Sequence, residues 1–409
     1  MDKLNNISYI KKCYGCGVCA IICPKQIIQI YINNDGFYQP HIEKEDKCIN
    51  CGLCLKVCSY TQTGLSVDND VLYSYAGWSN KPYVRQNSSS GGISFEIARY
   101  LIEQDYKAIG VRYNPELNRA EHFIATTVEE FIPSMGSKYI QSYTIDALKQ
   151  INKSKKYLII GTPCQIDSIN RYLKFLRIEE NFILMDFFCH GVPSKLVWDK
   201  YFSEIKKIIG KVTYVSWRSK NTNCNNLLNI DNKDEEQGIK VNWHDSYNLF
   251  LRGEKFSHSS RYSQGDSFYQ LFLCDGCLCE ACYDACKYKC RSSAADIRIG
   301  DLWGKKYKDN EDGVSGLVVY TKKGNNIIEK IDCTIIPEPF DVVSEGQMKT
   351  PAHRSRIYDS LWQLLREEDS TTCQLSEIVK KELKRKLIIN RLRHPVRSLI
   401  NLSKRFYKL

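Results

Sequence analysis

Hydrophobic and polar positions follow two different patterns along this chain of 409 residues. Beyond residue 70, short apolar runs of strand length are separated by longer stretches with a helical period. Five apolar runs predict strands, at residues 71–78, 108–112, 157–160, 182–188 and 314–320. The Ser88-Ser89-Ser90-Gly91-Gly92 segment predicts the start of a helix that runs to about Gln104. This order predicts βαβ units in an α/β domain with a mixed, partly parallel sheet.

The first 60 residues have a different pattern. Residues 27–32 predict a strand, Asn34-Asp35-Gly36 a turn and residues 37–38 the returning strand. Residues 61–70 are polar and predict a linker. We therefore expect a small α+β domain before the α/β region, and a helical, peripheral tail over residues 351–409.

The first domain contains two runs of four cysteines with the same spacing. Residues 13–23 read C-x2-C-x2-C-x3-C-P, and the same spacing of cysteines returns 35 residues later. It is typical of two [4Fe-4S] clusters in which the fourth cysteine of each run ligates the other cluster. The ligands predicted for the first cluster are Cys13, Cys16, Cys19 and Cys58. Those predicted for the second cluster are Cys48, Cys51, Cys54 and Cys23.

Structural zinc is the alternative interpretation of these thiols. Zinc sites usually present two separated pairs of ligands, whereas this chain repeats a run of four. We therefore predict that residues 1–60 are a bacterial-type 2[4Fe-4S] ferredoxin-like domain.

The 19 cysteines also bear on the compartment. No N-terminal stretch has the order of a signal peptide, and no apolar run nears the roughly 18 residues of a membrane span. We expect a cytoplasmic, reducing location, where so many cysteines serve as metal ligands or reactive thiols rather than disulfides.

Positive charge is concentrated at the C-terminal end. The net charge is +11, and residues 375–409 hold eleven Lys and Arg against two Glu. Two interpretations stay open: a solvated basic helix, or contact with an anionic membrane surface or an acidic partner, which would make the protein peripheral to the membrane. Nucleic acid is not expected, because no recognised binding module accompanies the charge.

Two further cysteines follow predicted strands. Cys164 comes directly after the strand at 157–160, and Cys189 after the strand at 182–188. The carboxyl ends of parallel strands meet at one sheet edge, so we expect these thiols to lie close together. Six more lie downstream, at Cys274, Cys277, Cys279, Cys282, Cys286 and Cys290. Four of the six would make a cluster alone, or two would join Cys164 and Cys189.

A different chemistry is also open to Cys164. With His190 at the same sheet edge, Cys164 would be a nucleophile and His190 the base that activates it. The many thiols nearby favour a cluster instead.

Five short motifs follow one another in a characteristic order. They are Ser89-Ser90-Gly91-Gly92, Gly136-Ser137-Lys138-Tyr139, Gly161-Thr162-Pro163-Cys164-Gln165, Cys189-His190-Gly191-Val192-Pro193-Ser194 and residues 296–304. In these motifs and the N-terminal cysteines, from about residue 13 to 320, the chain resembles the coenzyme F420 hydrogenase/dehydrogenase beta-subunit family with an N-terminal double-cluster ferredoxin domain. The resemblance implies a beta-subunit N-terminal-type α/β domain at 71–205. It also implies a C-terminal-type domain with the third cysteine cluster at 206–350.

The resemblance also implies two more cofactors, a third [4Fe-4S] cluster and FAD. The third cluster would use Cys164, Cys189 and the pair Cys282 and Cys286, which is spaced C-x3-C where the family has C-x2-C. Cys279 is therefore an alternative ligand.

The FAD site also rests on the resemblance, because no G-x-G-x-x-G follows a predicted strand. Backbone N–H groups of Ser89, Ser90, Gly91 and Gly92 would hold the pyrophosphate. Lys138 and Tyr139 would contact the flavin or the acceptor, unless they are only turn residues. His190 would lie beside a cluster sulfur or the flavin, or be an ordinary hydrogen-bonded histidine.

The function implied is an iron–sulfur flavoprotein oxidoreductase. It would relay electrons between [4Fe-4S] clusters and a flavin that acts on an organic or deazaflavin-like acceptor. Its partner would be a redox protein or a small-molecule acceptor. The alternative is an electron-transfer subunit of a larger complex with no substrate of its own.

Overall fold

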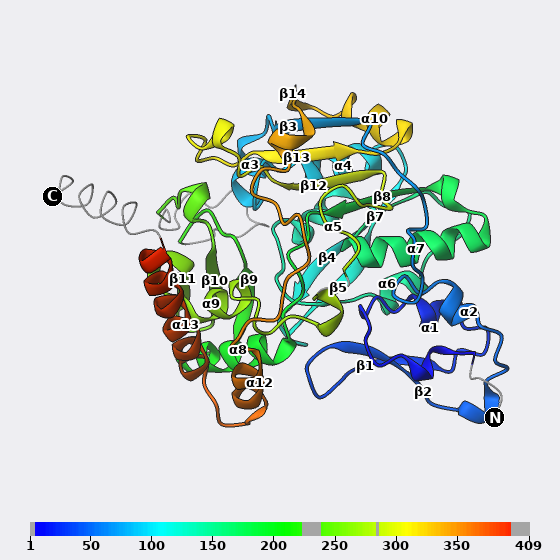
Figure 1. Ribbon diagram of the computed structural model, residues 1–409. Coiled ribbons are helices and arrows are strands. Elements are labelled where there is room, and N and C mark those ends of the chain that lie inside the picture. The colour runs from blue at the N-terminus through cyan, green and yellow to red at the C-terminus, as the bar shows by residue number, and fades with distance from the viewer. Residues whose placement is uncertain (1–4, 223–238, 284–285, 394–409) are drawn as a thin grey trace.

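The computed structural model describes residues 5–222, 239–283 and 286–393 (Figure 1). The largest unit among these residues is a nine-stranded mixed sheet with the order β14-β3-β13-β12-β8-β7-β4-β5-β6. Its strands are β3 Tyr73–Ser79, β4 Lys107–Asn114, β5 Arg119–Ala125, β6 Ser142–Tyr143, β7 Tyr157–Ile160, β8 Phe182–Phe187, β12 Ile297–Asp301, β13 Ser315–Val319 and β14 Cys333–Pro337. The central strands β4, β7, β8 and β12 are parallel, and antiparallel pairs flank them on both sides.

Helices cover both faces of this sheet. Successive residues of a strand point to opposite faces, and on β7 Leu158 packs with α4 (Ile93–Ile102), whereas Ile159 packs with α7 (Pro163–Leu176). The two central strands β7 and β8 are apolar throughout most of their length because both of their faces are covered.

The predicted strands are present, but one predicted connection is wrong. β3, α4 and β4 follow one another in the chain, but β3 and β4 are not neighbours in the sheet. Four other strands lie between them. β3 pairs instead with β13 and β14, which come more than 200 residues later in the chain. The sheet thus includes strands from both the predicted 71–205 and the predicted 206–350 domains.

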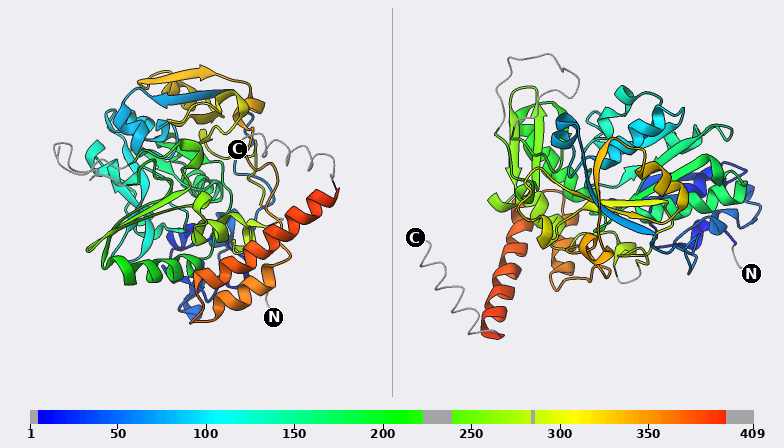
Figure 2. Two further views of the ribbon diagram at one scale, coloured as in Figure 1. Left: turned by 90° about the vertical axis from the view of Figure 1, so that its left-hand side faces the viewer. Right: turned by 90° about the horizontal axis from the view of Figure 1, so that it is seen from above.

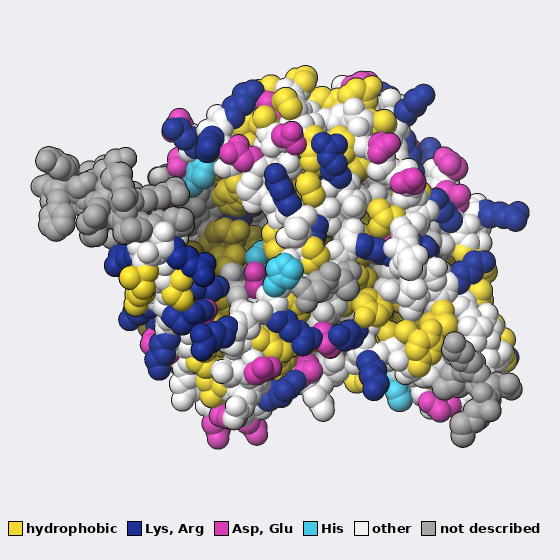
Figure 3. Space-filling view, in the orientation of Figure 1, with side chains coloured by type: hydrophobic (Ala, Val, Ile, Leu, Met, Phe, Trp, Pro, Cys, Tyr) yellow, Lys and Arg dark blue, Asp and Glu magenta, His cyan; other side chains and the backbone are white. Residues whose placement is uncertain are grey.

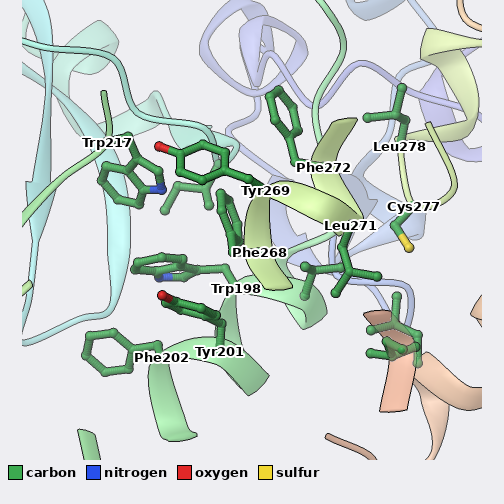
Figure 4. Close-up of a cluster of buried hydrophobic side chains, with 14 of the residues drawn as sticks. Trp198, Tyr201, Phe202, Trp217, Phe268, Tyr269, Leu271, Phe272, Cys277 and Leu278 are labelled. Atoms are coloured by element: carbon green, nitrogen blue, oxygen red, sulfur yellow. The ribbon is translucent and has the colours of Figure 1, made fainter. Parts of the chain in front are cut away.

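A smaller unit packs beside the large sheet. It is an antiparallel sheet of β9 (Val212–Ser216), β10 (Asn248–Gly253) and β11 (Ser257–Arg261), covered by α8 (Lys195–Ile209) and α9 (Ser267–Leu273). Aromatic side chains fill the space between them (Figure 4). The ring of Trp198 lies 4.7 Å from that of Trp217 and 5.4 Å from that of Phe268.

The N-terminal unit lies beneath α6 (Ile145–Lys149) and α7 (Figure 1). It contains the predicted hairpin, in which β1 (Ile28–Ile32) pairs antiparallel with β2 (Tyr38–Ile42). Two short helices follow its cysteine turns, α1 (Val18–Ile22) and α2 (Leu53–Lys56). Val18 and Val57 are buried in the same core as α7, so the unit is packed against the large sheet.

The C-terminal region is helical, as predicted, up to the last described residue. Its described helices are α12 (Tyr358–Arg366) and α13 (Thr372–Arg393), and the short α11 (Phe340–Val343) precedes the predicted tail. The first half of α13 packs on α9, and the second half projects away from the body (Figure 2). Residues 394–409 of the predicted tail lie outside the described residues.

Short helices complete the fold. They are α3 Pro82–Asn87, α5 Val128–Phe131 and α10 Lys322–Ile328. None of the helices that the structure describes has the length and apolar character needed to cross a membrane.

Candidate functional site

The thiols predicted for the first cluster gather around one turn. Gly15 and Gly17 have φ values of +69° and +73°, a left-handed backbone that lets the chain turn sharply between the cysteines. Cys13 and Cys19 both have Cys16 and Cys58 as neighbours, whose charge raises their pKa in addition to the larger effect of burial. Burial also raises the pKa of Cys16 to about 11. The fourth thiol thus comes from the second cysteine run.

The thiols predicted for the second cluster line a small pocket at the surface. They are Cys23, Cys48, Cys51 and Cys54. Gly52, at φ +71°, provides the turn before α2. Cys51 is exposed, whereas Cys54 is buried, so one side of this thiol group faces solvent.

The third thiol group forms at the edge of the large sheet. β7 and β8 are parallel neighbours, so Cys164, in the first turn of α7, lies near Cys189, which follows β8. The pKa of Cys164 is raised well above its ordinary value, first by burial and then by Cys189. Cys282 and Cys286 act on both thiols in the same direction, so four thiols from three segments share this place.

The neighbouring Cys279 lies between the first and third thiol groups. Its thiol donates to the Cys13 carbonyl oxygen over 3.3 Å. It also hydrogen-bonds to Cys282, and this bond lowers the pKa of Cys282. In the described part of the chain, no three His, Cys, Asp or Glu side chains are placed to hold a single metal ion. The thiol donors of each group are those that iron–sulfur clusters use.

A cavity of about 360 Å³ lies beside the third thiol group. This volume is within the range of small-molecule binding sites. Its wall includes most of the residues predicted to contact a flavin, namely Ser89, Ser90, Gly92, Lys138, Tyr139 and His190. Cys189 also contributes to the wall, so the cavity and the thiol group adjoin.

Two of the predicted motifs meet in this wall. The Ser137 N–H donates to Ser89 Oγ over 2.7 Å. Gly92 adopts φ +87° as the N-cap of α4, and no side chain of the described residues caps this helix. Ile93 and Ser94 in its first turn line the cavity, so the positive end of the helix dipole lies there and favours an anionic ligand group.

The N–H group of Gly91 does not have its predicted role. Its N–H donates to Ser315 Oγ over 3.0 Å and is therefore committed to the protein. A Cβ at this position would lie 2.4 Å from the Gly77 carbonyl oxygen. Glycine is required here for the close approach of the turn to β3, and the predicted phosphate contact of the Gly91 N–H is not available.

The Lys138 side chain hydrogen-bonds to the backbone of its own turn. Its ammonium donates to the carbonyl oxygens of Pro133, Met135 and Gly136 over 2.9 to 3.1 Å. Burial lowers its pKa to about 7. Lys138 thus fixes the loop before Tyr139.

Tyr139 and His190 belong to an aromatic group in the cavity wall. The rings of Tyr139 and Phe272 are stacked with centroids 4.8 Å apart. The His190 ring lies 5.0 Å from that of Phe272, and its Nε2 is 2.7 Å from Asp275 Oδ1. Cys164 has a different partner, since its sulfur lies 3.2 Å from Thr162 Oγ1.

The sequence indicated Asp301 and Trp303 of this wall, as part of the motif at residues 296–304, but not the arginine that lies behind them. Arg218, after β9, is fully buried and donates to Asp301 Oδ2 over 2.7 Å. Its guanidinium lies 4.5 Å from the Tyr247 ring and 4.8 Å from the Trp303 ring. Burial by itself would lower the pKa of Arg218, but Asp301 and the neighbouring tyrosines outweigh burial and raise it. The two partners are 83 positions apart, and no local pattern links them.

Three stretches of the chain match models of known families. Residues 74–149 match the family model described as coenzyme F420 hydrogenase/dehydrogenase, beta subunit N-term, and residues 154–336 match its C-terminal counterpart. Residues 12–61 match a 4Fe-4S dicluster domain.

Individual relatives are distant. The chain is 22% identical over 335 residues to the coenzyme F420-dependent sulfite reductase of Methanocaldococcus jannaschii, a match that covers 81% of this chain and 47% of that protein. It is 35% identical over 72 residues to the coenzyme F420 hydrogenase subunit beta of Methanococcus voltae, covering 16% of this chain and 26% of that subunit. The chain thus spans about half the length of the first relative and about a quarter of the second.

A solved structure of the F420-reducing [NiFe] hydrogenase complex from Methanosarcina barkeri, determined in a xenon-derivatization study, contains a chain that is similar at 14% identity. The match covers 79% of this chain and 95% of that one, with a TM-score of 0.43.

Proposed function

The chain belongs to the coenzyme F420 hydrogenase/dehydrogenase beta-subunit family, and we propose that it is an iron–sulfur flavoprotein oxidoreductase. Single electrons would move between three [4Fe-4S] clusters and FAD, which acts on an organic acceptor. The N-terminal unit would be a two-cluster ferredoxin-like domain, in keeping with its match to a dicluster domain.

One observation carries this proposal: the third thiol group adjoins the cavity. Cys164, Cys189, Cys282 and Cys286 come from three separate segments, yet they gather where Cys189 and His190 form part of the cavity wall. A cluster in this position would be next to a ligand in the cavity. That is the arrangement that electron transfer between the two requires.

The cavity wall suits a flavin nucleotide. The uncapped start of α4 would hold the pyrophosphate, with Gly92, Ile93 and Ser94 contributing N–H groups. Tyr139 and Trp303 would supply apolar surface to the ring system, and the Asp301 carboxylate would accept a hydrogen bond from it. Bound FAD would supply the conversion between one-electron and hydride chemistry.

The proposed acceptor is a deazaflavin of the coenzyme F420 type, because both matched relatives carry that coenzyme in their names. The other candidate function is an electron-transfer subunit without a substrate of its own. The cavity, which such a subunit would not need, favours the first candidate.

Cofactor analysis of anaerobically purified full-length protein tests the proposal. We expect about twelve iron atoms and one FAD per chain. The variant Cys189→Ala should lose about four iron atoms and keep those of the N-terminal unit. Cys373→Ala is the matched control, because Cys373 is exposed on α13, and it should keep all the iron.

Other results would contradict the proposal. Stoichiometric zinc without iron would make the protein a zinc-stabilised one. Full iron without flavin would favour the electron-transfer subunit. Full iron in both Cys189→Ala and Cys164→Ala would eliminate the shared third cluster, and loss of turnover in Cys164→Ala alone would then favour a nucleophile.

A further inference from the structure

The two N-terminal thiol groups differ in their access to solvent. Cys51 of the second group is exposed, and Ile49, which lines the same pocket, is 59% exposed. In the first group, Cys16, Cys19 and Cys58 are all buried. One group therefore reaches the surface, and the other is enclosed by protein.

The enclosed group touches the third thiol group through Tyr14. This residue lies between Cys13 and Cys16 in the chain, and its ring packs edge-on against Tyr60 at 5.3 Å and Tyr288 at 5.8 Å. Cys164, Cys282 and Cys286 of the third group lie close enough for their charge to raise the pKa of Tyr14. Tyr14 and Tyr288 also line the cavity. One aromatic ring thus joins the first group, the third group and the cavity.

A hydrogen-bonded path runs beside this ring. Ser59 follows Cys58 of the first group, and its hydroxyl donates to the carbonyl oxygen of Cys164 over 3.0 Å. The Ser59 N–H donates to Ser168 Oγ, also over 3.0 Å, and Ser168 hydrogen-bonds to the Cys16 thiol. A path of covalent and hydrogen bonds therefore runs from the first thiol group to the third. The contacts found for the second group, with Asn6 and Asn50, stay within the N-terminal unit.

The pocket at the second group has a volume of about 20 Å³ and is lined by the four thiols themselves, so a cluster held by them would occupy it. The cavity of about 360 Å³ lies near the third group, so the described residues offer the organic acceptor a site there and not at the Cys51 edge. A single electron needs no pocket, only a close approach of two redox centres.

We propose that the two N-terminal clusters have unequal roles. The cluster at Cys51 is the terminal at which a one-electron redox protein docks, and the cluster at Cys13 is the internal step that exchanges electrons with the third cluster past Tyr14 and Ser59. This inference rests on the proposed function. In the reducing direction, two molecules of reduced one-electron protein are oxidised for each flavin reduced, and the protons come from water.

The docking surface is tested with Ile49→Asp in the full-length holoprotein. The probe is a reduced bacterial-type ferredoxin, and stopped-flow absorbance follows reduction of the N-terminal clusters. A buried charge at the contact should lower the second-order rate constant about tenfold, while reduction by dithionite stays unchanged. Tyr31→Asp is the matched control, because Tyr31 is an exposed apolar residue (46%) on β1 of the same N-terminal unit but does not line the Cys51 pocket.

The internal step is tested with Tyr14→Leu, Tyr14→Phe and Ser59→Ala. Tyr14→Leu should slow flavin reduction after normal reduction of the N-terminal clusters, and Tyr14→Phe, which keeps the ring, should restore the rate. Iron content identifies any variant that fails to assemble, and Ser59→Ala then provides the second measurement because it removes only a hydroxyl.

The outcomes separate this inference from the proposed function. Missing iron or flavin in the unmodified protein refutes the proposed function. Equal ferredoxin rates for Ile49→Asp and the unmodified protein overturn the docking site. Unchanged flavin reduction in both Tyr14→Leu and Ser59→Ala overturns the internal step, even when all cofactors are present.

Discussion

At the scale of single residues, the cavity wall depends on a buried ion pair. The Arg218 guanidinium has no exposed surface, and its hydrogen bonds go to Asp301, Ser246 and Tyr139. Burying a charge is costly unless a partner of opposite charge is near, so Arg218 depends on the Asp301 carboxylate. This pair also holds Tyr247 and Trp303 in place through their contacts with the guanidinium.

The first prediction concerns this pair. Asp301→Asn should lower the free energy of unfolding by about 3–5 kcal/mol, because it leaves the Arg218 charge buried without its carboxylate. Urea denaturation monitored by fluorescence measures the change. The double variant Arg218→Met/Asp301→Asn should recover part of the loss, since it removes the buried charge. A loss in Asp301→Asn that is below about 1 kcal/mol would contradict the role assigned to the pair.

His122 allows a prediction about pH. Burial lowers its pKa to about 4, and Nε2 lies 3.1 Å from the Ile160 carbonyl oxygen, so the ring is neutral in the folded protein. In the unfolded chain the pKa is about 6.5, so the unfolded state binds more protons as the pH falls below that value. Between pH 7.5 and 5.5 this residue should remove about 1 kcal/mol of stability. Chemical denaturation of His122→Gln at both pH values should show a smaller loss than the unmodified protein; an equal loss would contradict this role.

At the scale of elements, α13 has two different halves. Leu375 and Val379 are buried against the body, but Leu383, Leu387, Ile388 and Leu392 are all exposed. Leu383 and Leu392 are nine residues apart and so lie on opposite sides of the helix. Figure 3 shows Lys and Arg side chains interspersed with these hydrophobic ones at the exposed end of α13. The described part of α13 therefore lacks the single apolar face of a membrane-surface helix, and its exposed end carries mainly positive charge.

The α13 prediction follows from this distribution. Arg391→Ser/Arg393→Ser should weaken binding to immobilised heparin, a polyanionic probe, and added salt should weaken binding of the unmodified chain as well. Leu387→Ser/Ile388→Ser should bind heparin as the unmodified chain does, because these side chains carry no charge. Both variants should unfold at the same temperature as the unmodified protein, since these side chains are exposed. Binding lost only in the leucine and isoleucine variant would indicate an apolar contact.

At the scale of the whole molecule, one lysine ties the N-terminal unit to the third thiol group. Lys287, next to Cys286, donates to the carbonyl oxygens of Ser59, Gln62 and Gly64 over 2.6 to 3.0 Å. The segment that follows the second cysteine run is thereby held against the loop of the third group. Distances between redox centres in the two regions depend on this attachment.

Lys287→Met should loosen that attachment. Losing hydrogen bonds from a charged donor should cost about 2 kcal/mol of local stability, so limited proteolysis should cut within residues 61–70 sooner. Electron transfer from the N-terminal clusters to the cavity should slow in parallel. Lys44→Met, which alters an exposed lysine of the same unit that does not line the Cys51 pocket, should leave both measurements unchanged. Unaltered proteolysis of Lys287→Met would show that other contacts hold the unit.

Local rules were sufficient for much of this protein. The spacing of the N-terminal cysteines, the hairpin, the strands that precede Cys164 and Cys189, and the helical C-terminal end all follow from short-range periodicity and turn chemistry, and the structure contains each element. The parallel pairing of β7 with β8 also brought the two cysteines to one edge, as the sheet rule predicts.

Only the tertiary structure decided which distant segments meet. It separated β3 from β4, committed the Gly91 N–H to Ser315, paired Arg218 with Asp301 and placed Tyr14 against the third thiol group. Each of these contacts joins residues more than 80 positions apart, except the placement of β3 and β4, which later strands impose. Periodicity shows which face of an element is buried but not what it is buried against, because that partner is selected by the packing of the whole chain.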